Sequence, residues 1–310
     1  MDKRWTVVII VLAVLALVSF ALSALITSFV NMGSSSIAEP SVRLGKGNIA
    51  LISIKGAIMP SDGFNIVTPG VSSDSIIRDI EKADRDPNVK ALLLEINSPG
   101  GAAVASQEVA DAVKAVDKFK VAWIRETGAS GAYWVASAAD RIVASPLSIT
   151  GSIGVLASYL DFSGFLVDHN VTYQRIVGGQ YKDIGSPMKS LTDEERAILQ
   201  ESIDEMHRFF VKEVAINRNL PLDYVEGIAT GAFYTGTKAK ELGLIDVLGS
   251  RKEAVKIVED ELNIKSNLIV YKEKLTFLDA LTSMASDVSY KMGQGIGSVF
   301  LDKGNIKIVT

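Results

Sequence analysis

The chain has 310 residues, and its 32 lysines and arginines against 36 aspartates and glutamates give a formal net charge of -4. This balance offers no basic field for nucleic acid, and the length suits one large folded unit or two small ones. The absence of cysteine excludes a disulfide scaffold, a cysteine nucleophile and thiolate metal sites. The two histidines, His169 and His207, are too few for a multi-histidine metal centre. We therefore expect no metal ion and no other cofactor.

A long apolar run lies near the N-terminus. Residues 5–30 carry no charged side chain and follow Lys3 and Arg4. As a helix rising ~1.5 Å per residue, this run spans about 39 Å, more than the ~30 Å hydrocarbon core of a bilayer. A cleavable signal peptide has a shorter apolar region. The pattern predicts a single-pass transmembrane signal anchor at 5–30, which contacts membrane lipid.

The basic residues before this anchor predict its orientation. Lys3 and Arg4 favour the cytoplasmic side, so residues 1–4 form a cytoplasmic stub. The rest of the chain is then expected to be extracytoplasmic, at the cell membrane. Residues 31–48 contain a Gly-Ser-Ser-Ser run and Pro40, which predict a flexible linker before the folded part.

From residue 49 onward, short apolar runs alternate with amphipathic ones. Strands that alternate with helices of this length predict an α/β fold, with a mostly parallel sheet between flanking helices. A longer helix is predicted at about 191–219, with acidic residues at its N-terminal end that suit the helix dipole and a packing role. The predicted strands are 49–54, 89–96, 121–124, 141–144 and 171–177, and the other predicted helices are 76–83 and 105–116.

Two loops follow predicted buried strands, where open α/β sheets place their active sites. Residues 97–101, Asn-Ser-Pro-Gly-Gly, come first. Two glycines before a helix let the backbone turn sharply and direct free N–H groups at an anion or a carbonyl oxygen. The same pattern also suits an ordinary strand-to-helix turn.

The second loop, residues 127–134, contains a Gly-Ala-Ser-Gly turn that places the Ser130 hydroxyl at the start of a helix. This arrangement follows the logic of a nucleophile elbow, although the spacing differs. Local pattern favours a simple helix N-cap for Ser130 over a nucleophile. A serine nucleophile also needs a base. Neither histidine lies in a glycine-rich turn, and His207 is expected on a solvated helix face.

A lysine can serve as the base when it is neutral, which requires burial or a cationic neighbour. Lys182 is the best candidate, because it lies in a glycine-framed loop after the strand predicted at 171–177. Most other lysines occur in helical charge patterns or near the termini. The ordinary alternative for Lys182 is an exposed loop lysine.

These segments, in this order, resemble the signal peptide peptidase A family of membrane-anchored serine proteases. The resemblance covers about residues 49–264 and implies a ClpP/crotonase-like fold of repeated ββα units. It indicates the short form of the family, with one catalytic domain at 49–264 and a C-terminal tail of unknown role at 265–310. The matching segments are 97–101, 129–131 with Tyr133, 149–155 (Ile-Thr-Gly-Ser-Ile-Gly-Val), 181–183, and 234–236 with 243–246.

The resemblance also implies roles for particular residues. Ser130 is expected as the nucleophile, Lys182 as the general base that later protonates the leaving amine, and Ser152 as the group that orients the lysine. The oxyanion hole is expected from the N–H groups of Gly101 and Gly131. An extended substrate is expected to pair as an added strand. The residues expected to bind it are Gly100, Ile149, Thr150, Gly151 and Ile153.

The function implied is a serine endopeptidase with a Ser-Lys dyad that degrades cleaved signal peptides or other membrane-associated peptides. In similar short forms several subunits assemble, and the serine and lysine can come from neighbouring subunits. The resemblance therefore implies that this chain forms a homo-oligomer whose active sites are shared between neighbouring subunits. Three alternatives stay open. One is a membrane-protein quality-control protease with the same dyad, and another is a catalytically silent peptide-binding membrane scaffold. The third, a crotonase-like enzyme acting on acyl thioesters, is disfavoured because little acyl-CoA occurs outside the cell.

Overall fold

The structure is a computed structural model that describes residues 42–44, 47–60 and 70–272. These residues fall in one compact unit, Arg43–Glu273 apart from Val42. The transmembrane anchor predicted at 5–30, and most of the predicted linker and tail, lie outside the described residues. Within the ranges described, no helix is long and apolar enough to cross a membrane.

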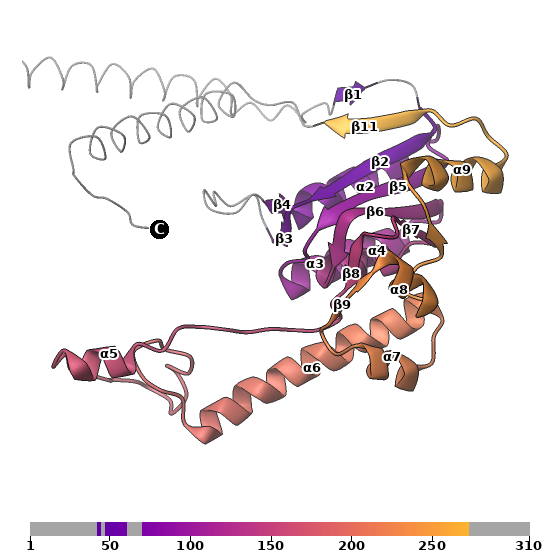
Figure 1. Cartoon of the computed structure of the whole chain (residues 1–310). Helices are drawn as coiled ribbons and strands as arrows, with labels where there is room; N and C mark the ends of the chain where they lie inside the picture. The colour runs from indigo at the N-terminus through magenta and orange to yellow at the C-terminus, as the bar shows by residue number, and fades with distance from the viewer. Residues whose placement is uncertain (1–41, 45–46, 61–69, 273–310) are drawn as a thin grey trace, which may run out of the picture. The chain divides into compact units, whose positions relative to one another are not determined.

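A mostly parallel sheet forms the centre of this unit (Figure 1). The strand order is β1-β11-β2-β5-β6-β7-β10, with β8 beside β6 and β9 beside β8. The pairs from β11 to β10 are parallel, and β9 runs antiparallel to β8. The predicted α/β fold with a mostly parallel sheet is thus confirmed. The strands of this sheet are β1 (Val42–Leu44), β2 (Ile49–Lys55), β5 (Ala91–Ser98), β6 (Phe119–Ala129), β7 (Arg141–Ala144), β8 (Ile149–Gly151), β9 (Phe233–Thr235), β10 (Val247–Leu248) and β11 (Leu268–Lys272); β3 (Ala57–Met59) and β4 (Gly70–Ser72) pair separately.

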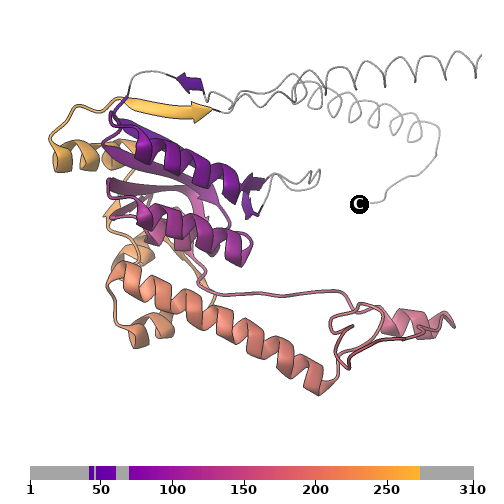
Figure 2. The same ribbon diagram turned by 180° about the vertical axis from the view of Figure 1, so that it is seen from behind.

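Helices pack on both faces of the sheet (Figures 1 and 2). Side chains alternate between the two faces along a strand. In β5, Leu92 and Leu94 therefore join the cluster that includes α2, α3 and α4, whereas Leu93 joins Val258 of α9 on the other face. Burial on both faces explains the continuous apolar runs in the sequence. The helices are α2 (Ser73–Arg85), α3 (Ala103–Ala115), α4 (Gly131–Ser137), α5 (Ser163–Asp168), α6 (Asp193–Arg218), α7 (Leu222–Ile228), α8 (Gly236–Glu241) and α9 (Arg251–Leu262).

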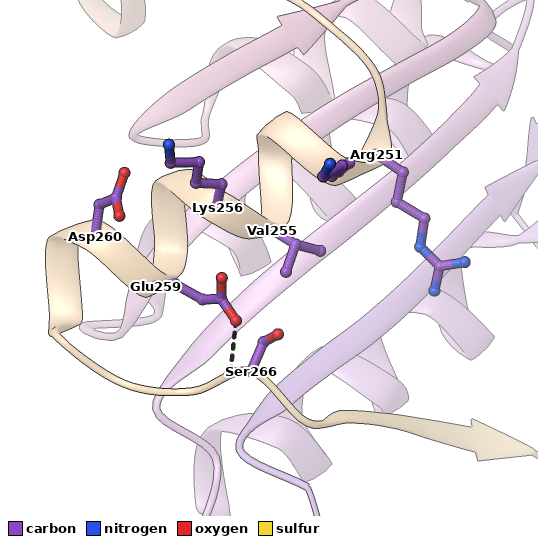
Figure 3. A pocket seen from close by; sticks show the side chains of 7 residues that line it. Arg251, Val255, Lys256, Glu259, Asp260 and Ser266 are labelled. Atoms are coloured by element: carbon purple, nitrogen blue, oxygen red, sulfur yellow. Dashed lines mark hydrogen bonds between the residues drawn. The ribbon is translucent and has the colours of Figure 1, made fainter.

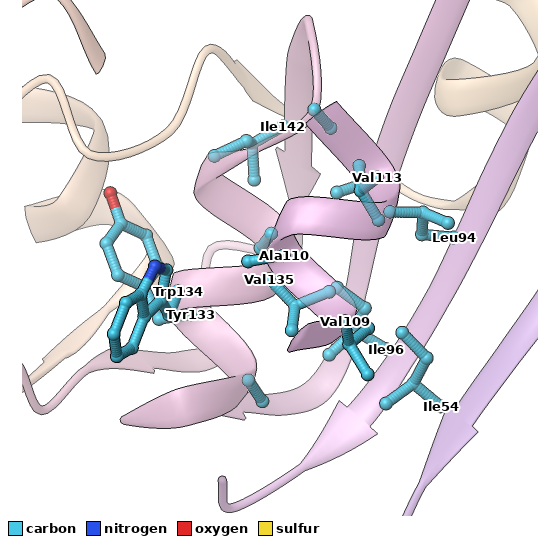
Figure 4. Close-up of a cluster of buried hydrophobic side chains, with 14 of the residues drawn as sticks. Ile54, Leu94, Ile96, Val109, Ala110, Val113, Tyr133, Trp134, Val135 and Ile142 are labelled. Carbon is cyan, nitrogen blue, oxygen red and sulfur yellow. The ribbon is translucent and has the colours of Figure 1, made fainter. Parts of the chain in front are cut away.

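Helix α4 is buried along its whole length (Figure 4). Trp134 stacks on Phe210 of α6 with ring centroids 4.8 Å apart. The Tyr133 hydroxyl donates to the Leu244 carbonyl at 2.8 Å, and burial raises the pKa of Tyr133 above its usual range, so this donor stays neutral. The short helix that begins just after Ser130 is therefore held rigidly in the core.

The C-terminal end of α6 is fixed by a buried ion pair. The Arg218 side chain is 8% exposed, and its Nη2 donates to Asp246 Oδ1 at 2.7 Å. Asp246 Oδ2 in turn accepts from the Ile142 N–H at 2.7 Å, at the start of the β7 ladder. The helix predicted at about 191–219 is confirmed, and it packs through its C-terminal half, where its buried apolar residues lie.

Residues 154–194 contain no buried side chain. Figures 1 and 2 both show α5 and the coil around it beyond the N-terminal end of α6, away from the sheet. The strand predicted at 171–177 is wrong, because this stretch is exposed coil. Its apolar residues have no sheet to pair with, and Ile176 is 96% exposed. A strand without a ladder partner gains neither hydrogen bonds nor burial.

The sheet extends past both boundaries predicted for the catalytic domain. Strand β11 begins at Leu268, beyond the boundary at 264, and pairs parallel with β2. Strand β1 lies next to β11, within the linker predicted at 31–48. The side chain of Ile269 is fully buried. Strand β11 also covers the edge of β2, which would otherwise present unpaired backbone groups.

Candidate active site

The carboxyl ends of β5 and β6 meet at one edge of the sheet. Their register shifts there, from Ile96 opposite Ile124 to Ser98 opposite Gly128, so β6 carries two extra residues. The Asn97 side-chain oxygen accepts from the Thr127 N–H at 3.2 Å, inside this bulge. A bulge redirects the strand that follows it. Here it leads β6 into Ser130 beside the glycine loop that follows β5.

The glycine loop is paired on one side only. The Ile58 N–H of β3 donates to the Gly100 carbonyl at 2.9 Å, and the Ala102 N–H donates to the Ile58 carbonyl at 2.9 Å. This is the parallel pattern, in which the neighbours of Gly101 supply the bonds and its own N–H points away from β3. Within the described residues, no acceptor takes this N–H. This N–H is therefore available to bind an oxyanion. An ordinary strand-to-helix turn does not need such an unpaired donor.

Ser130 occupies the N-cap position of α4 but does not cap it. Its side chain makes no capping hydrogen bond, and its backbone has φ 53° and ψ -129°. For a non-glycine residue this conformation costs about 1–3 kcal/mol, and such strain gathers at functional sites. The Ser130 N–H donates to the Gly151 carbonyl at 2.8 Å, which helps to hold the turn. The N-cap interpretation thus does not account for the hydroxyl.

The predicted nucleophile and oxyanion donors lie together. A Cβ added to Gly100 would lie 2.9 Å from the Cβ of Ser130, and one added to Gly131 would lie 3.5 Å from the Gly101 nitrogen. Ser130 is half-buried and Gly101 is exposed, so the site opens to solvent. The structure therefore brings Ser130, Gly100, Gly101 and Gly131 together, and their chemical roles stay predictions.

Ser152 lies in register with Ser130. Strands β6 and β8 pair with Ala129 opposite Gly151, so the two serines are the next residues along neighbouring parallel strands. Like Ser130, Ser152 has a positive φ, 51°. Its hydroxyl donates to the Gly231 carbonyl at 3.3 Å, and the hydroxyl oxygen can still accept from an amine. This position suits the orienting role predicted for Ser152.

The edge predicted to bind substrate is partly occupied. Residues Ile149, Thr150 and Gly151 pair with β6 on one side and with β9 on the other. The side chains of Thr150 and Ile153 are also buried. A substrate strand therefore finds no free backbone edge within β8 while β9 is in place. The pairing continues past Gly151, because the Ser152 N–H donates to the Ala232 carbonyl at 2.9 Å and the Ile153 carbonyl accepts from the Gly231 N–H at 3.0 Å. The substrate-binding role of these residues stays a prediction.

The structure does not bring Lys182 to Ser130 within one chain. Lys182 is exposed in the coil between α5 and α6, and its side chain has no hydrogen bond or ion pair with any described residue. The Ser130 hydroxyl likewise has no hydrogen-bond partner in the described part.

The solvated position predicted for His207 is wrong: its ring is half-buried, and its Nε2 is buried without a described partner.

Sequence reasoning missed Ser106. This residue of α3 is fully buried, and its hydroxyl has no partner among the described residues. A Cβ on Gly131 would lie 2.1 Å from the Ser106 oxygen, so Ser106 fills the space beside the expected oxyanion donor. In the sequence Ser106 is one small residue on an apolar helix face. Only the packing of α3 on α4 makes it visible.

A surface hollow on α9 lies elsewhere (Figure 3). In it the Ser266 N–H donates to Glu259 Oε1 at 2.9 Å. Helix α9 covers the sheet face opposite α4, so this hollow is separate from Ser130. In the described ranges, no three His, Asp or Glu side chains cluster closely enough to hold a metal ion. The hollow is lined by Arg251, Lys252, Val255, Lys256, Glu259, Asp260 and Ser266.

Comparisons with known proteins agree on one family. Residues 112–265 match the sequence model of peptidase family S49. A Methanocaldococcus jannaschii protein named as a protease is 39% identical over 227 residues, 73% of this chain and 72% of that protein. An Enterococcus faecium protein named as signal peptide peptidase SppA is 32% identical over 251 residues, 79% of this chain and 73% of that protein. Protease 4 of Salmonella typhi is 35% identical over 256 residues, 81% of this chain and 41% of that protein.

The α/β fold and the placement of Ser130 beside the glycine loop at the edge of the sheet, together with these matches, define a serine peptidase. The chain belongs to peptidase family S49, the family of the signal peptide peptidase A proteins. The resemblance drawn from the sequence motifs is thereby confirmed.

Proposed function

We propose that the chain is a membrane-anchored serine endopeptidase that uses Ser130 and Lys182 to degrade cleaved signal peptides or other membrane-associated peptides. The observation that carries the proposal is the uncapped, strained Ser130 beside the unpaired N–H of Gly101. The fold that we propose for the catalytic unit is the ClpP/crotonase-like arrangement of ββα units. A relative named as signal peptide peptidase SppA supports the substrate class.

In the proposed reaction, Ser130 Oγ attacks the carbonyl carbon of the peptide bond while neutral Lys182 Nζ takes the hydroxyl proton. The N–H groups of Gly101 and Gly131 stabilise the oxyanion. Lys182 then gives the proton to the leaving amine as the C–N bond breaks. Water hydrolyses the acyl-enzyme with the lysine again as base, and Ser152 orients the lysine throughout.

We further propose that Lys182 acts on Ser130 of a neighbouring subunit in a homo-oligomer. Within one chain the coil between α5 and α6, which carries Lys182, lies away from α4, at whose start Ser130 is placed (Figures 1 and 2). This segment also has no core of its own. Several large apolar side chains exposed in one segment favour an interaction surface there. A second copy is the occupant that would both cover them and complete the site. The exposed apolar residues include Leu156, Leu160, Phe165, Val167 and Ile176.

The membrane location that we propose rests on residues 5–30 and on the basic pair before them. An anchor of this kind would hold the catalytic unit outside the cytoplasm, near the bilayer from which hydrophobic peptides emerge. Protease added to spheroplasts should then digest the catalytic unit. Complete protection of the unit would overturn this topology.

The proposed activity is tested with the full chain in detergent, on a fluorogenic peptide with small apolar residues. Ser130→Ala and Lys182→Ala should each lose nearly all activity at unchanged oligomeric state. Wild-type rates in Lys182→Ala would show that the base lies elsewhere. An inactive but fully assembled wild type would favour the silent scaffold. Faster cleavage of an intact membrane-protein segment than of a signal peptide would favour the quality-control protease.

Sharing between subunits is tested by mixing the two inactive variants during assembly. A site built from Ser130 of one subunit and Lys182 of another survives in about a quarter of random neighbouring pairs. Mixed oligomers should therefore recover activity that neither variant has alone. No recovery after verified mixing would place the lysine and the serine of each site in the same chain.

A further inference from the structure

We propose that the ion-paired cluster around Lys182 is a positioning device for the general base. Two tethers hold the residues on either side of Lys182, and one of them also compensates the carboxylate next to it. The inference rests on the proposed function, because it takes Lys182 as the base that reaches Ser130.

The first tether holds Asp183. Arg175 Nε donates to Asp183 Oδ2 at 2.7 Å, and Arg175 Nη2 donates to Asp183 Oδ1 at 2.9 Å. Two parallel bonds between a guanidinium and a carboxylate fix orientation as well as distance. Arg175 Nη2 also donates to the Gln180 carbonyl at 2.6 Å. Arg175 therefore spans the short loop that contains Lys182.

The second tether holds Tyr181. Its hydroxyl donates to Glu194 Oε1 at 2.5 Å, in the first turn of α6. The loop backbone is folded as well, because the Lys182 N–H donates to the Gly179 carbonyl at 3.2 Å. The residues before and after Lys182 are thus pinned. The Lys182 side chain has no partner in the described part of the chain, so it extends freely from a backbone that its neighbours hold in place.

The cluster continues into the start of α6. Lys189 pairs with Glu195 and lies 3.6 Å from Asp183 Oδ1. Glu195 closes the capping box of α6 with Thr192, whose N–H donates to Glu195 Oε2 at 3.1 Å. A segment without a buried core is therefore joined to the rigid helix by charged contacts. The position of Lys182 follows the position of α6.

Each carboxylate around Lys182 accepts a hydrogen bond from a side chain of the cluster. A base must be neutral to accept a proton, and an uncompensated carboxylate nearby would favour the protonated lysine. Hydrogen bonds from Arg175 lower the pKa of Asp183, which keeps the pair ionised and mutually compensated. The hydroxyl of Tyr181 donates a hydrogen bond to the Glu194 carboxylate, and Lys189 forms an ion pair with Glu195. The charged and titratable groups of the cluster are Tyr173, Arg175, Tyr181, Asp183, Lys189, Glu194 and Glu195.

A purely structural cluster and a positioning cluster predict different pH behaviour. Arg175→Gln removes the compensating cation, so the acidic limb of kcat/KM against pH should move to higher pH by roughly half a unit to one unit. Asp183→Asn removes the carboxylate and leaves Arg175 and Lys189, so the limb should move by a similar amount to lower pH. Loss of folded protein lowers activity but moves the limb in neither direction.

Tyr181→Phe serves as the charge-neutral variant. It removes the second tether without changing charge near Lys182, so kcat should fall about tenfold while the acidic limb stays in place. The matched control is Arg85→Gln on α2, which breaks an exposed ion pair with Glu81 of 2.8 Å. This control should keep both kcat and the limb of the wild type.

The profiles are measured on the full chain in detergent, with a peptide free of titratable groups and with Lys182→Ala in parallel. Opposite shifts for Arg175→Gln and Asp183→Asn, with an inactive Lys182→Ala, support the inference. An inactive Lys182→Ala with unshifted limbs in both variants overturns the inference and leaves the proposed function standing. A fully active Lys182→Ala overturns the proposed function, and the inference with it.

Discussion

The Ile58 backbone holds Gly101 so closely that a Cβ on this glycine would lie 2.0 Å from the Ile58 carbonyl oxygen. The contact is part of the pairing that turns the Gly101 N–H away from β3. One short strand thus excludes a side chain on one side of the loop and leaves a hydrogen-bond donor free on the other.

Gly101→Ala should therefore lose activity through displacement of this donor. The methyl group forces the loop away from Ile58, and loss of one oxyanion donor typically lowers kcat about 100- to 1,000-fold. Steady-state kinetics check the fall. Gly227→Ala on α7 is the control, because nothing lies within 4 Å of its added Cβ, and it should keep wild-type kcat. A Gly101→Ala variant with wild-type kcat would exclude this N–H from the oxyanion hole.

Gly131→Ala should fail for a different steric reason, with a specific rescue. The new Cβ would lie 2.1 Å from the Ser106 oxygen and 2.7 Å from the Ser106 Cβ. Ser106→Gly removes both atoms, so the double variant should regain much of the activity lost in Gly131→Ala. Rates of the two single variants and of the double variant, compared as a cycle, check this coupling. Losses that simply add would show that Ser106 is not the obstacle.

The sequence predicted the parts of the fold that local pattern determines. Apolar runs located β2, β5 and β7, and the periodicity of 191–219 located α6. Glycine chemistry located both loops of the candidate site. The contacts of Ile58 with Gly101 and of Ser106 with Gly131 have no sequence signal, because each joins different elements of the fold.

The strand predicted at 171–177 failed for a related reason. Its apolar pattern is that of a buried strand, yet in this chain the segment has neither a ladder partner nor a core. An apolar pattern indicates that a segment favours burial away from water, but it does not identify the element or subunit that buries it. The proposed neighbouring subunit accounts for the pattern. Local pattern could not reveal the separation of Lys182 from Ser130, because it depends on this same segment; the expectation of shared active sites came from the family resemblance alone.

Arg218→Met should destabilise the fold markedly. It leaves Asp246 without its partner, and the Gly243 carbonyl loses two donated bonds. Breaking a largely buried pair costs about 3 kcal/mol of unfolding free energy. Urea denaturation measures the loss. Arg85→Met on α2, whose Arg side chain is 77% exposed in its pair, should change the free energy by under about 1 kcal/mol. Equal effects of both substitutions would contradict a special role for the buried pair.

The segment that carries Lys182 should loosen in acid before the sheet does. Hydrogen bonds from Lys189 and from the Thr192 N–H lower the pKa of Glu195, and those from Arg175 lower the pKa of Asp183. A carboxyl group with a depressed pKa in the folded state contributes stability above its unfolded value, about 4, and that stability is lost as pH falls through the folded pKa. Hydrogen exchange of amides in 175–195, corrected for intrinsic rates, should therefore accelerate below about pH 4. In Glu195→Gln the charge-dependent part of this protection should already be absent at neutral pH. Two results together would contradict the prediction: amide protection in the wild type that does not change between neutral and acid pH, and equal protection in Glu195→Gln. They would show that these carboxylates do not hold the segment.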